Sequence, residues 1–376
     1  MAANLITSGL GIGILSLPWS AAGASTVLGA AVSGVVMLVM AWASCIVVEA
    51  GEKWQVFDLG SLLRLLPGRL GPLAQWTCDA NIWLSGFLTL VGYFMVIADT
   101  IVHMLGQRGI QDDGVLDIRS VLIVLTAAIS LPLCYLNQQY LSWTSFLAIA
   151  VNVYLFALVF YFAAWHTTES PVCTFGFGRG LITLSSTLTM ALAIPAFCLP
   201  MYETLERRSV VRFRVIAYGS FGFLFTLFVG FQVAAMYAFG PNVMQNVLSE
   251  LPGNIAGDLA RIAMIPLLLA CYPVNVIPMV APIQTAKLTS SAIAGITLAV
   301  LLTALFVTEL GVLNVINGAL SVVVIDGFAP GLVGIFLLEK SRCAMCSMIG
   351  VGIVMAIVGF MFSENFADDI KATCVL

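Results

Sequence analysis

The feature that most constrains this chain is the length of its stretches without a charged residue. A membrane-spanning helix needs about 20 mostly apolar residues, and most of these stretches reach or exceed that length. Residues 1–48, 120–168, 180–202, 215–249, 262–286, 288–308, 310–325 and 343–363 contain no Asp, Glu, Lys or Arg. The strict alternation of polar and apolar residues that a membrane β-barrel needs is not seen in the sequence. The pattern therefore predicts an all-α membrane protein.

Composition excludes the other broad classes. Of the 376 residues, 61% are hydrophobic and only 9% are charged, whereas an ordinary soluble domain has about 25% charged residues. A soluble protein of this size could not cover its surface with so few charges. The apolar content excludes disorder. A formal net charge of -4 without a basic patch offers nucleic acid no surface to bind.

We expect about 11 membrane-spanning helices, separated by the charged and polar residues between the apolar stretches. They are placed at roughly 2–20, 24–49, 79–105, 120–136, 141–164, 180–202, 214–239, 259–282, 287–308, 311–338 and 343–363. Ten of the Lys and Arg residues fall in one set of connecting loops and five in the other. Because cytoplasmic loops are richer in Lys and Arg, we expect a cytoplasmic N-terminus and a C-terminus outside the cell or in a lumen.

The first apolar stretch contains a local sequence that disfavours a continuous helix. Gly9, Gly11 and Gly13 fall within five residues, and Pro18 follows. Glycine weakens helices and proline removes a backbone donor. In lipid, a broken helix is tolerated only where it is buried in protein or lines a cavity. We expect residues 8–15 to be non-helical and to face the interior; the alternative is close helix–helix packing through small residues.

From Asn4 to Pro18 the sequence resembles the first helix of the amino acid/auxin permease family. The residues that carry the resemblance are Asn4, Gly11, Gly13, Ile14, Leu15, Leu17 and Pro18. Weaker likenesses follow in the family's order, at residues 131–133 with Leu141 and Ser145, at residues 199–203 and at residues 272–278. The resemblance covers essentially the whole chain.

The resemblance implies a LeuT-like fold in a single transmembrane transporter domain over residues 1–376. It implies a first repeat over residues 1–164, an inverted second repeat over residues 179–338 and an extra helix at 343–363. The first helix of each repeat is then interrupted, and Pro195 and Pro200 in the sixth helix agree with that expectation. Interrupted helices at corresponding places in two halves point to a substrate site near the membrane midplane.

The resemblance implies transport of amino acids, and freed backbone groups suit such a substrate. Freed N–H groups attract its carboxylate, and freed carbonyls attract its ammonium group. The substrate-binding residues that we expect are Thr7, Ser8, Gly11, Ile12, Gly13, Ile14, Met190, Ala191 and Ala193. Because the wall at residues 190–193 is apolar and uncharged, we expect a small or medium neutral amino acid.

Two carboxylates lie within the predicted helices and are candidates for proton coupling. An intramembrane carboxylate is costly and is by default a hypothesis of function. Asp326 is the deeper of the two, whereas Asp99 lies near a predicted helix end, where solvation or capping is the alternative. Residues 262–283 contain no Ser or Thr that could supply oxygen ligands to sodium. We therefore expect transport to be coupled to protons rather than to sodium, or to no ion.

Other functions are compatible with parts of this pattern. A sensor can use a transporter fold without moving its ligand, and an ion channel or carrier shares the apolar helices, although no charged or Gly-rich filter is evident. An enzyme is not expected, because His103 and His166 are the only histidines and neither has a catalytic partner at helical spacing. We expect no cofactor and no metal. The expected partners are the substrate, the coupling proton and the lipid of a plasma, vacuolar or lysosomal-type membrane.

Overall fold

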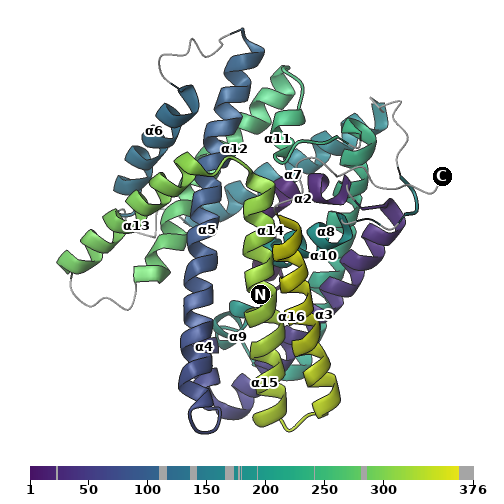
Figure 1. Cartoon of the computed structure of the whole chain (residues 1–376), viewed down its shortest axis with the longest axis vertical. Helices are drawn as coiled ribbons and strands as arrows, with labels where there is room; N and C mark the ends of the chain where they lie inside the picture. The colour runs from purple at the N-terminus through teal and green to yellow at the C-terminus, as the bar shows by residue number, and fades with distance from the viewer. Residues whose placement is uncertain are drawn as a thin grey trace.

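The computed structural model of the chain is helical throughout the residues that it describes (Figure 1). These are residues 1–22, 24–109, 117–135, 142–165, 173–176, 178, 180–192, 194–240, 242–280 and 286–363. Within them, side chains are not described for residues 3, 4, 7, 8, 142–146, 277, 278, 286, 362 and 363. The all-α fold predicted from the charge-free stretches is confirmed.

Eight of the described helices are long and apolar enough to cross a membrane. Seven of them are α3 (Thr26–Trp54), α5 (Leu70–Gln107), α7 (Ser142–Trp165), α10 (Val210–Phe239), α12 (Ile255–Val280), α13 (Ala286–Phe306) and α16 (Arg342–Ser363), and the eighth runs from Leu310 to Phe336. Shorter apolar helices occur at α6 (Ile118–Leu133) and over Gly180–Ala196. The small helices α4 (Leu59–Arg64) and α11 (Val247–Glu250) lie in connections.

One helix boundary predicted from the sequence is clearly wrong. The third helix was expected to begin at residue 79, but α5 begins at Leu70. Asp79, the first residue of the predicted span, lies inside the helix and against α4, where a Cβ added to Gly60 would collide with its carboxylate. The helix therefore continues beyond the apolar stretch because its extra turns pack on α4.

Three of the spans are not regular α-helices. The first consists of α1 (Ala2–Gly9) and α2 (Gly13–Ala22) with residues 10–12 between them. The second consists of α8 (Gly180–Ala191), the 3-10 turn η2 (Ile194–Ala196) and α9 (Cys198–Glu203). The third consists of α14 (Leu310–Ser321), the π-helical segment η3 (Val322–Phe328) and α15 (Ala329–Phe336).

The causes of these irregularities are local. Glycines flank and occupy the first break, and Pro195 lies in the 3-10 turn of the second. In the third, Pro330 cannot donate a hydrogen bond to the carbonyl of Asp326 four residues earlier. The π-helical segment that ends just before Pro330 changes the bonding pattern at that carbonyl. The break in the first helix is shorter than predicted, because the helix resumes at Gly13 rather than after Leu15.

The interrupted helices occupy the centre of the bundle. Every residue of α2 is buried, because α2 lies between α8, α10 and α14. The small helices mark the two ends of the molecule: α4, α9 and α15 lie at the bottom of Figure 1 and α11 lies at the top. We call these the α4 end and the α11 end.

Candidate functional site

A cavity of about 150 Å³ lies where the first and second interrupted helices meet. The breaks contribute Gly11, Ile12 and Gly13 from the first helix and Met190, Ala191, Ala196 and Phe197 from the sixth. The remaining lining residues are Ile82, Ser85, Gly86, Thr89 and Tyr93 of α5, Asn275 of α12 and Ile325 of η3. The cavity is therefore bounded by all three irregular spans and by two continuous helices.

Gly11 and Gly13 have different surroundings within the first break. A Cβ added to Gly11 would meet no atom within 4 Å, whereas one added to Gly13 would lie 2.7 Å from the Cβ of Ala191. Gly11 therefore leaves its backbone open to the cavity, and Gly13 allows α2 to touch the end of α8. No L residue larger than glycine fits at Gly13 without moving one of the two breaks.

The start of α2 presents backbone donors beside this open space. The N–H groups of Ile14 and Leu15 donate to the carbonyls of Gly11 and Ile12 at 3.3 and 3.1 Å. No backbone acceptor is seen, among the described residues, for the N–H groups of Gly11, Ile12 and Gly13. Unpaired donors at a helix N-terminus favour an anionic group. The cavity can thus bind a carboxylate without any charged side chain.

The wall opposite the breaks is polar and comes from α5 and α12. Ser85, Thr89 and Tyr93 follow one another at intervals of four, so they share a face of α5. The Asn275 side-chain amide donates to the Tyr93 hydroxyl at 3.2 Å and to the Cys271 carbonyl at 3.0 Å. Both amide hydrogens are then committed, which leaves the amide oxygen of Asn275 as an acceptor. The Tyr93 hydroxyl keeps its own proton to donate.

Buried polar bonds attach α14 to the helices around the cavity. The amide of Asn314 donates to the Ser16 hydroxyl at 2.6 Å, and the amide of Asn317 donates to the Ser85 carbonyl at 3.2 Å. On the other side, the single hydroxyl proton of Thr189 is shared between the Ser186 carbonyl of its own helix at 2.8 Å and the Gly318 carbonyl at 3.2 Å. These bonds attach the tenth helix directly to the first, third and sixth helices, which line the cavity.

The residues predicted to bind substrate do not all lie on the cavity. Gly11, Ile12, Gly13, Met190 and Ala191 line it. Ile14 is completely buried in the core instead, because the helix has already resumed there. Thr7 and Ser8 belong to α1, but their side chains lie outside the described residues, as does Ala193 as a whole.

Asp326 lies in η3 and is 3% exposed. Neither carboxylate oxygen has a hydrogen-bond partner within the described part of the chain. The preceding residue, Ile325, lines the cavity, and η3 contacts the 3-10 turn η2 of the sixth helix. A buried charge without a partner is costly, and π-helical segments are frequent at functional sites. Asp326 is thus a buried carboxyl group without a described partner, in the segment that contributes Ile325 to the cavity.

Asp99 has the opposite environment. Its carboxylate accepts a hydrogen bond from Nε of Arg119 at 2.7 Å. The same guanidinium donates to the carbonyls of Ala304 and Val307 at 3.3 and 3.0 Å. The pair joins α5 and α6 to the end of α13. Asp99 therefore has a fixed partner in Arg119. A structural role of this kind is compatible with its position near the end of a helix.

Sequence reasoning missed the polar wall of the cavity. The signal was the spacing of Ser85, Thr89 and Tyr93 in an otherwise apolar helix, which places three polar groups on one buried face. It also overlooked the Cys-x-x-Cys pair formed by Cys343 and Cys346 at the start of α16. Both thiols are exposed, and the described residues contain no group of three potential metal ligands.

Comparisons with known proteins agree with this arrangement. Residues 1–364 match the family described as transmembrane amino acid transporter protein. Amino acid transporter AVT6E of Arabidopsis thaliana is 26% identical over 294 residues, which cover 72% of this chain and 59% of that protein. Sodium-coupled neutral amino acid transporter 7 of Xenopus laevis is 25% identical over 293 residues, which cover 72% of this chain and 62% of that protein. The chain thus spans about three fifths of the length of these relatives.

A solved structure shares the fold along almost the whole chain. The crystal structure of MhsT in complex with L-phenylalanine superposes with a TM-score of 0.57 at 14% sequence identity and covers 96% of this chain and 97% of that one. At this identity the likeness shows the fold alone, which is the LeuT-like fold expected from the sequence. Because the family match extends over residues 1–364, the chain belongs to the transmembrane amino acid transporter family.

Proposed function

We propose that this chain is a secondary active transporter that carries small or medium neutral amino acids by alternating access and is coupled to protons. The observation that carries the proposal is the cavity where two interrupted helices meet and where, among the described residues, N–H groups of the first break have no backbone acceptor. Membership of an amino acid transporter family supports amino acid transport. The substrate, the coupling ion and the transport cycle are our proposals.

The substrate binds with its backbone on the breaks and its side chain toward Met190 and Phe197. The α-carboxylate accepts from the N–H groups of Gly11, Ile12 and Gly13, and the ammonium group meets carbonyls at the C-terminal ends of α1 and α8. Among the described residues, no charged side chain lines the cavity. A charged substrate side chain would therefore lack a partner. The volume is close to that of a cavity of about 150 Å³ that holds benzene, which favours a compact side chain.

Sodium coupling is the principal alternative, because one relative is named a sodium-coupled transporter. Sodium needs several oxygen ligands, and α12 offers few side-chain oxygens. The Tyr272 hydroxyl donates to Thr297 at 3.0 Å, away from the first helix, and Asn275 is bonded to Tyr93. The helix is continuous through its prolines. A proton needs only one titratable group, and Asp326 is buried without a partner beside the cavity.

Alternating access requires contacts that open and close at each end. At the α4 end, Glu49 bridges Arg214 at 2.6 Å and Lys340 at 2.9 Å. At the α11 end, Asp258 bridges Arg108 and Arg261, each at 3.1 Å. We propose that residues 1–164 and 179–338 form the two inverted repeats and that residues 343–363 form the extra helix. We also propose that, when the cavity opens to one side of the membrane, the interrupted helices move against the continuous ones.

The orientation that we propose puts the α4 end in the cytoplasm. That end carries most of the basic side chains, including Lys53, Arg64 and Lys340. Cys173, between α7 and α8, is disulfide-bonded, and disulfides belong to oxidising compartments. Position 173 lies in a connection predicted to be outside or lumenal. The orientation fits a plasma membrane and a vacuolar or lysosomal-type membrane equally well.

Counterflow in proteoliposomes tests the substrate class directly. Liposomes preloaded with alanine or leucine should accumulate the radiolabelled neutral amino acid, whereas lysine and glutamate should neither exchange nor compete. Gly11→Val should fold, because its Cβ has open space, but should stop exchange by filling the cavity. Gly219→Val is the matched control, since Gly219 also has open space but lies on α10 away from the cavity.

Two results would contradict the proposal. One is a preference for lysine or glutamate over neutral amino acids. The other is exchange by the Gly11→Val protein that equals exchange by the Gly219→Val protein at the same reconstituted amount. A Gly13→Val protein should also be inactive, and its closer contact with Ala191 should in addition lower its thermal stability.

A further inference from the structure

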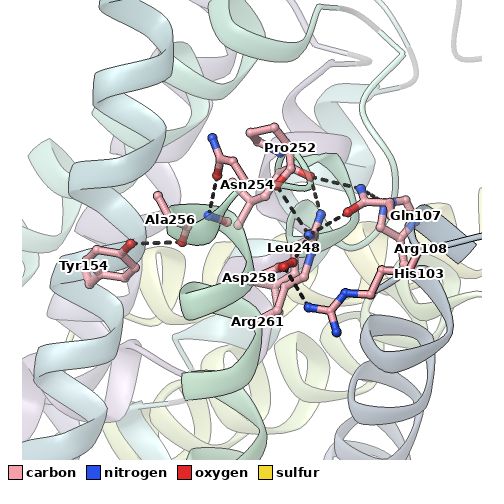
Figure 2. A network of polar contacts seen from close by, with 12 residues as sticks. His103, Gln107, Arg108, Tyr154, Leu248, Pro252, Asn254, Ala256, Asp258 and Arg261 are labelled. Carbon is pink, nitrogen blue, oxygen red and sulfur yellow. Dashed lines mark hydrogen bonds and ion pairs between the residues drawn. The ribbon is translucent and has the colours of Figure 1, made fainter. Parts of the chain in front are cut away.

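A polar cluster lies at the α11 end (Figure 2), and none of its labelled residues lines the cavity. Its centre is Arg261, in the second turn of α12, whose side chain is fully buried. The guanidinium donates to the carbonyls of Leu248 at 2.9 Å, Leu251, and Pro252 at 3.5 Å. These carbonyls belong to residues 244–254, which we call the α11 segment. Arg261 thus ties the α11 segment to α12.

The α11 segment closes this end of the bundle above the first helix. Val247 and Leu248 are completely buried, and α11 contacts α2, α5 and α12. The side chain of Gln245 accepts from the Gly311 N–H at 2.7 Å. The segment can therefore move only if its bonds to the neighbouring helices are released.

The bond from Arg261 to α5 depends on a single amide. Nη1 of Arg261 donates to Oε1 of Gln107 at 3.0 Å, and Nε2 of Gln107 lies 2.9 Å from Nε2 of His103 (Figure 2). Gln107 also packs against Gly253 so closely that a Cβ there would lie 2.7 Å from its Oε1. The NH₂ group of Gln107 also donates to the Leu251 carbonyl at 3.5 Å, and the amide of Asn246 donates to the Thr100 hydroxyl of α5 at 3.4 Å. The last turn of α5 therefore holds the α11 segment through Gln107, and Thr100 adds a second bond from the same helix.

The donor and acceptor rules fix every member of this chain of bonds. A guanidinium has donors and no acceptor, so Gln107 must turn its oxygen toward Arg261. Its NH₂ group, which is a donor only, then faces His103. The Nε2 atom of His103 must accept, which requires the neutral ring with its proton on Nδ1.

Protonation of His103 makes this arrangement impossible. Both ring nitrogens of a histidinium are donors, so Nε2 would oppose the NH₂ group of Gln107. If the amide turned over, its NH₂ group would oppose Arg261. Gln107 must therefore give up either His103 or Arg261, and the new positive charge also repels Arg261. An ordinary histidine makes this change near pH 6.5.

The other charged groups around this end of α5 do not remove the conflict. They are Arg108 on α5, Asp258 on α12, Glu250 on α11, Arg119 with its partner Asp99, and Glu309 before α14. Asp258 already accepts from Arg108 and Arg261. Glu250 accepts from the Met244 N–H, and Asp99 accepts from Arg119. Asp258, Glu250 and Asp99 are thus each bonded to groups other than His103.

From this geometry we infer that His103, Gln107 and Arg261 form a pH-operated latch on the α11 segment. At neutral pH the latch is closed and the segment is held to α5. In acid, protonation of His103 breaks this chain of bonds at Gln107 and places a second positive charge near Arg261, so the segment loosens. The latch would link the closure of the α11 end to the acidity of the compartment that this end faces, independently of the group that carries the coupled proton.

Hydrogen–deuterium exchange of the full-length protein in detergent or nanodiscs tests the latch without a transport assay. Protection factors, which remove the intrinsic pH dependence of exchange, are compared at about pH 5 and about pH 7.5, on either side of the ordinary histidine pKa. We expect protection of the amides in residues 244–254 to be about tenfold lower in acid, the size expected for one net hydrogen bond. Peptides from the α4 end should show no such change.

Three variants separate the latch from a general effect of acid. His103→Gln keeps an acceptor for Gln107 at every pH, so protection should stay high in acid. Gln107→Glu supplies a carboxylate that accepts from both Arg261 and protonated His103, so its pH response should be reversed. Tyr154→Phe is the matched control, because it removes the 2.9 Å bond to the Ala256 carbonyl without touching the latch and should keep the wild-type pH response.

The inference is overturned if wild-type protection in residues 244–254 does not change between the two pH values. It is equally overturned if His103→Gln retains the full wild-type response to acid. Should His103→Gln fold poorly, the sign of the response in Gln107→Glu decides by itself: reversal supports the latch, and a wild-type response rules it out.

Discussion

Asp99 and Asp326 are both carboxylates inside the helical bundle, yet their surroundings differ in every respect that matters for a proton. Asp99 is bonded at 2.7 Å to Arg119, which also binds two carbonyls of α13. Asp326 is more deeply buried and has no hydrogen-bond partner in the described residues. One lies in a regular helix and the other in a π-helical segment.

The difference shows that depth in the membrane does not by itself identify a coupling group. A carboxylate with a fixed guanidinium partner is stable as an ion and gains little from a proton. A buried carboxylate with no partner is costly as an ion, so proton uptake changes its energy strongly. Because Ile325 lines the cavity and η3 contacts the break of the sixth helix, we propose that this change is felt at the cavity.

The largest expected effect is that of Asp326→Asn. The amide keeps the shape of the side chain but cannot lose a proton. Uptake driven by an imposed pH gradient should fall to the level of protein-free liposomes, while counterflow without a gradient should persist. The thermal unfolding temperature should be unchanged, since no partner is lost. Full pH-driven uptake by this variant would remove Asp326 from the coupling mechanism.

Asp99→Asn should have the converse phenotype. Loss of the Asp99 carboxylate weakens the attachment of α5 and α6 to α13. We expect the free energy of unfolding to fall by about 1–3 kcal/mol for this partly exposed ion pair. pH-driven uptake per folded molecule should remain. Thermal unfolding in detergent measures the first effect and reconstituted uptake the second. Adding Arg119→Gln should recover part of the stability, because no unpaired charge then remains; a coupling defect in Asp99→Asn would erase the distinction between the two carboxylates.

A smaller effect is expected from tightening the contact behind Asp326. A Cβ added to Gly352 of α16 would lie 3.2 Å from Cα of Gly327 and from the carbonyl of Val322, so Gly352→Ala should push α16 from η3. We expect a loss of about 1 kcal/mol and slower pH-driven uptake. Gly350 on the same helix has open space where a Cβ would be added. Gly350→Ala should therefore lower neither the stability of the protein nor the rate of pH-driven uptake. Equal behaviour of the two variants would mean that η3 does not depend on this packing.

The sequence predicted the fold class well because the constraint behind it is simple. Long charge-free stretches have few alternatives to membrane helices. The interruptions at Gly11 and Pro195 followed equally from local chemistry, since glycine and proline act on the backbone wherever they stand. The length of the first break was wrong, because packing of Gly13 on Ala191 lets the helix resume earlier than composition suggests.

The site was less predictable because it depends on which helices meet. Nothing near Asp99 in the sequence reveals that Arg119 lies beside it, and nothing in the α12 sequence shows that Asn275 is bonded to Tyr93. The latch is similar: His103 and Gln107 are one turn apart, but Arg261 is far along the chain. Ile14 matched the family pattern and was assigned to the site, although it faces the core.

The most direct test of the account measures proton movement itself. Proteoliposomes that contain a pH-sensitive dye are given a neutral amino acid in the absence of sodium, with the membrane potential clamped. Wild-type protein and Asp99→Asn should acidify the interior on addition of the substrate, and Asp326→Asn should not. Accumulation that needs a sodium gradient and moves no protons, or acidification that is undiminished in Asp326→Asn, would contradict proton coupling through this residue.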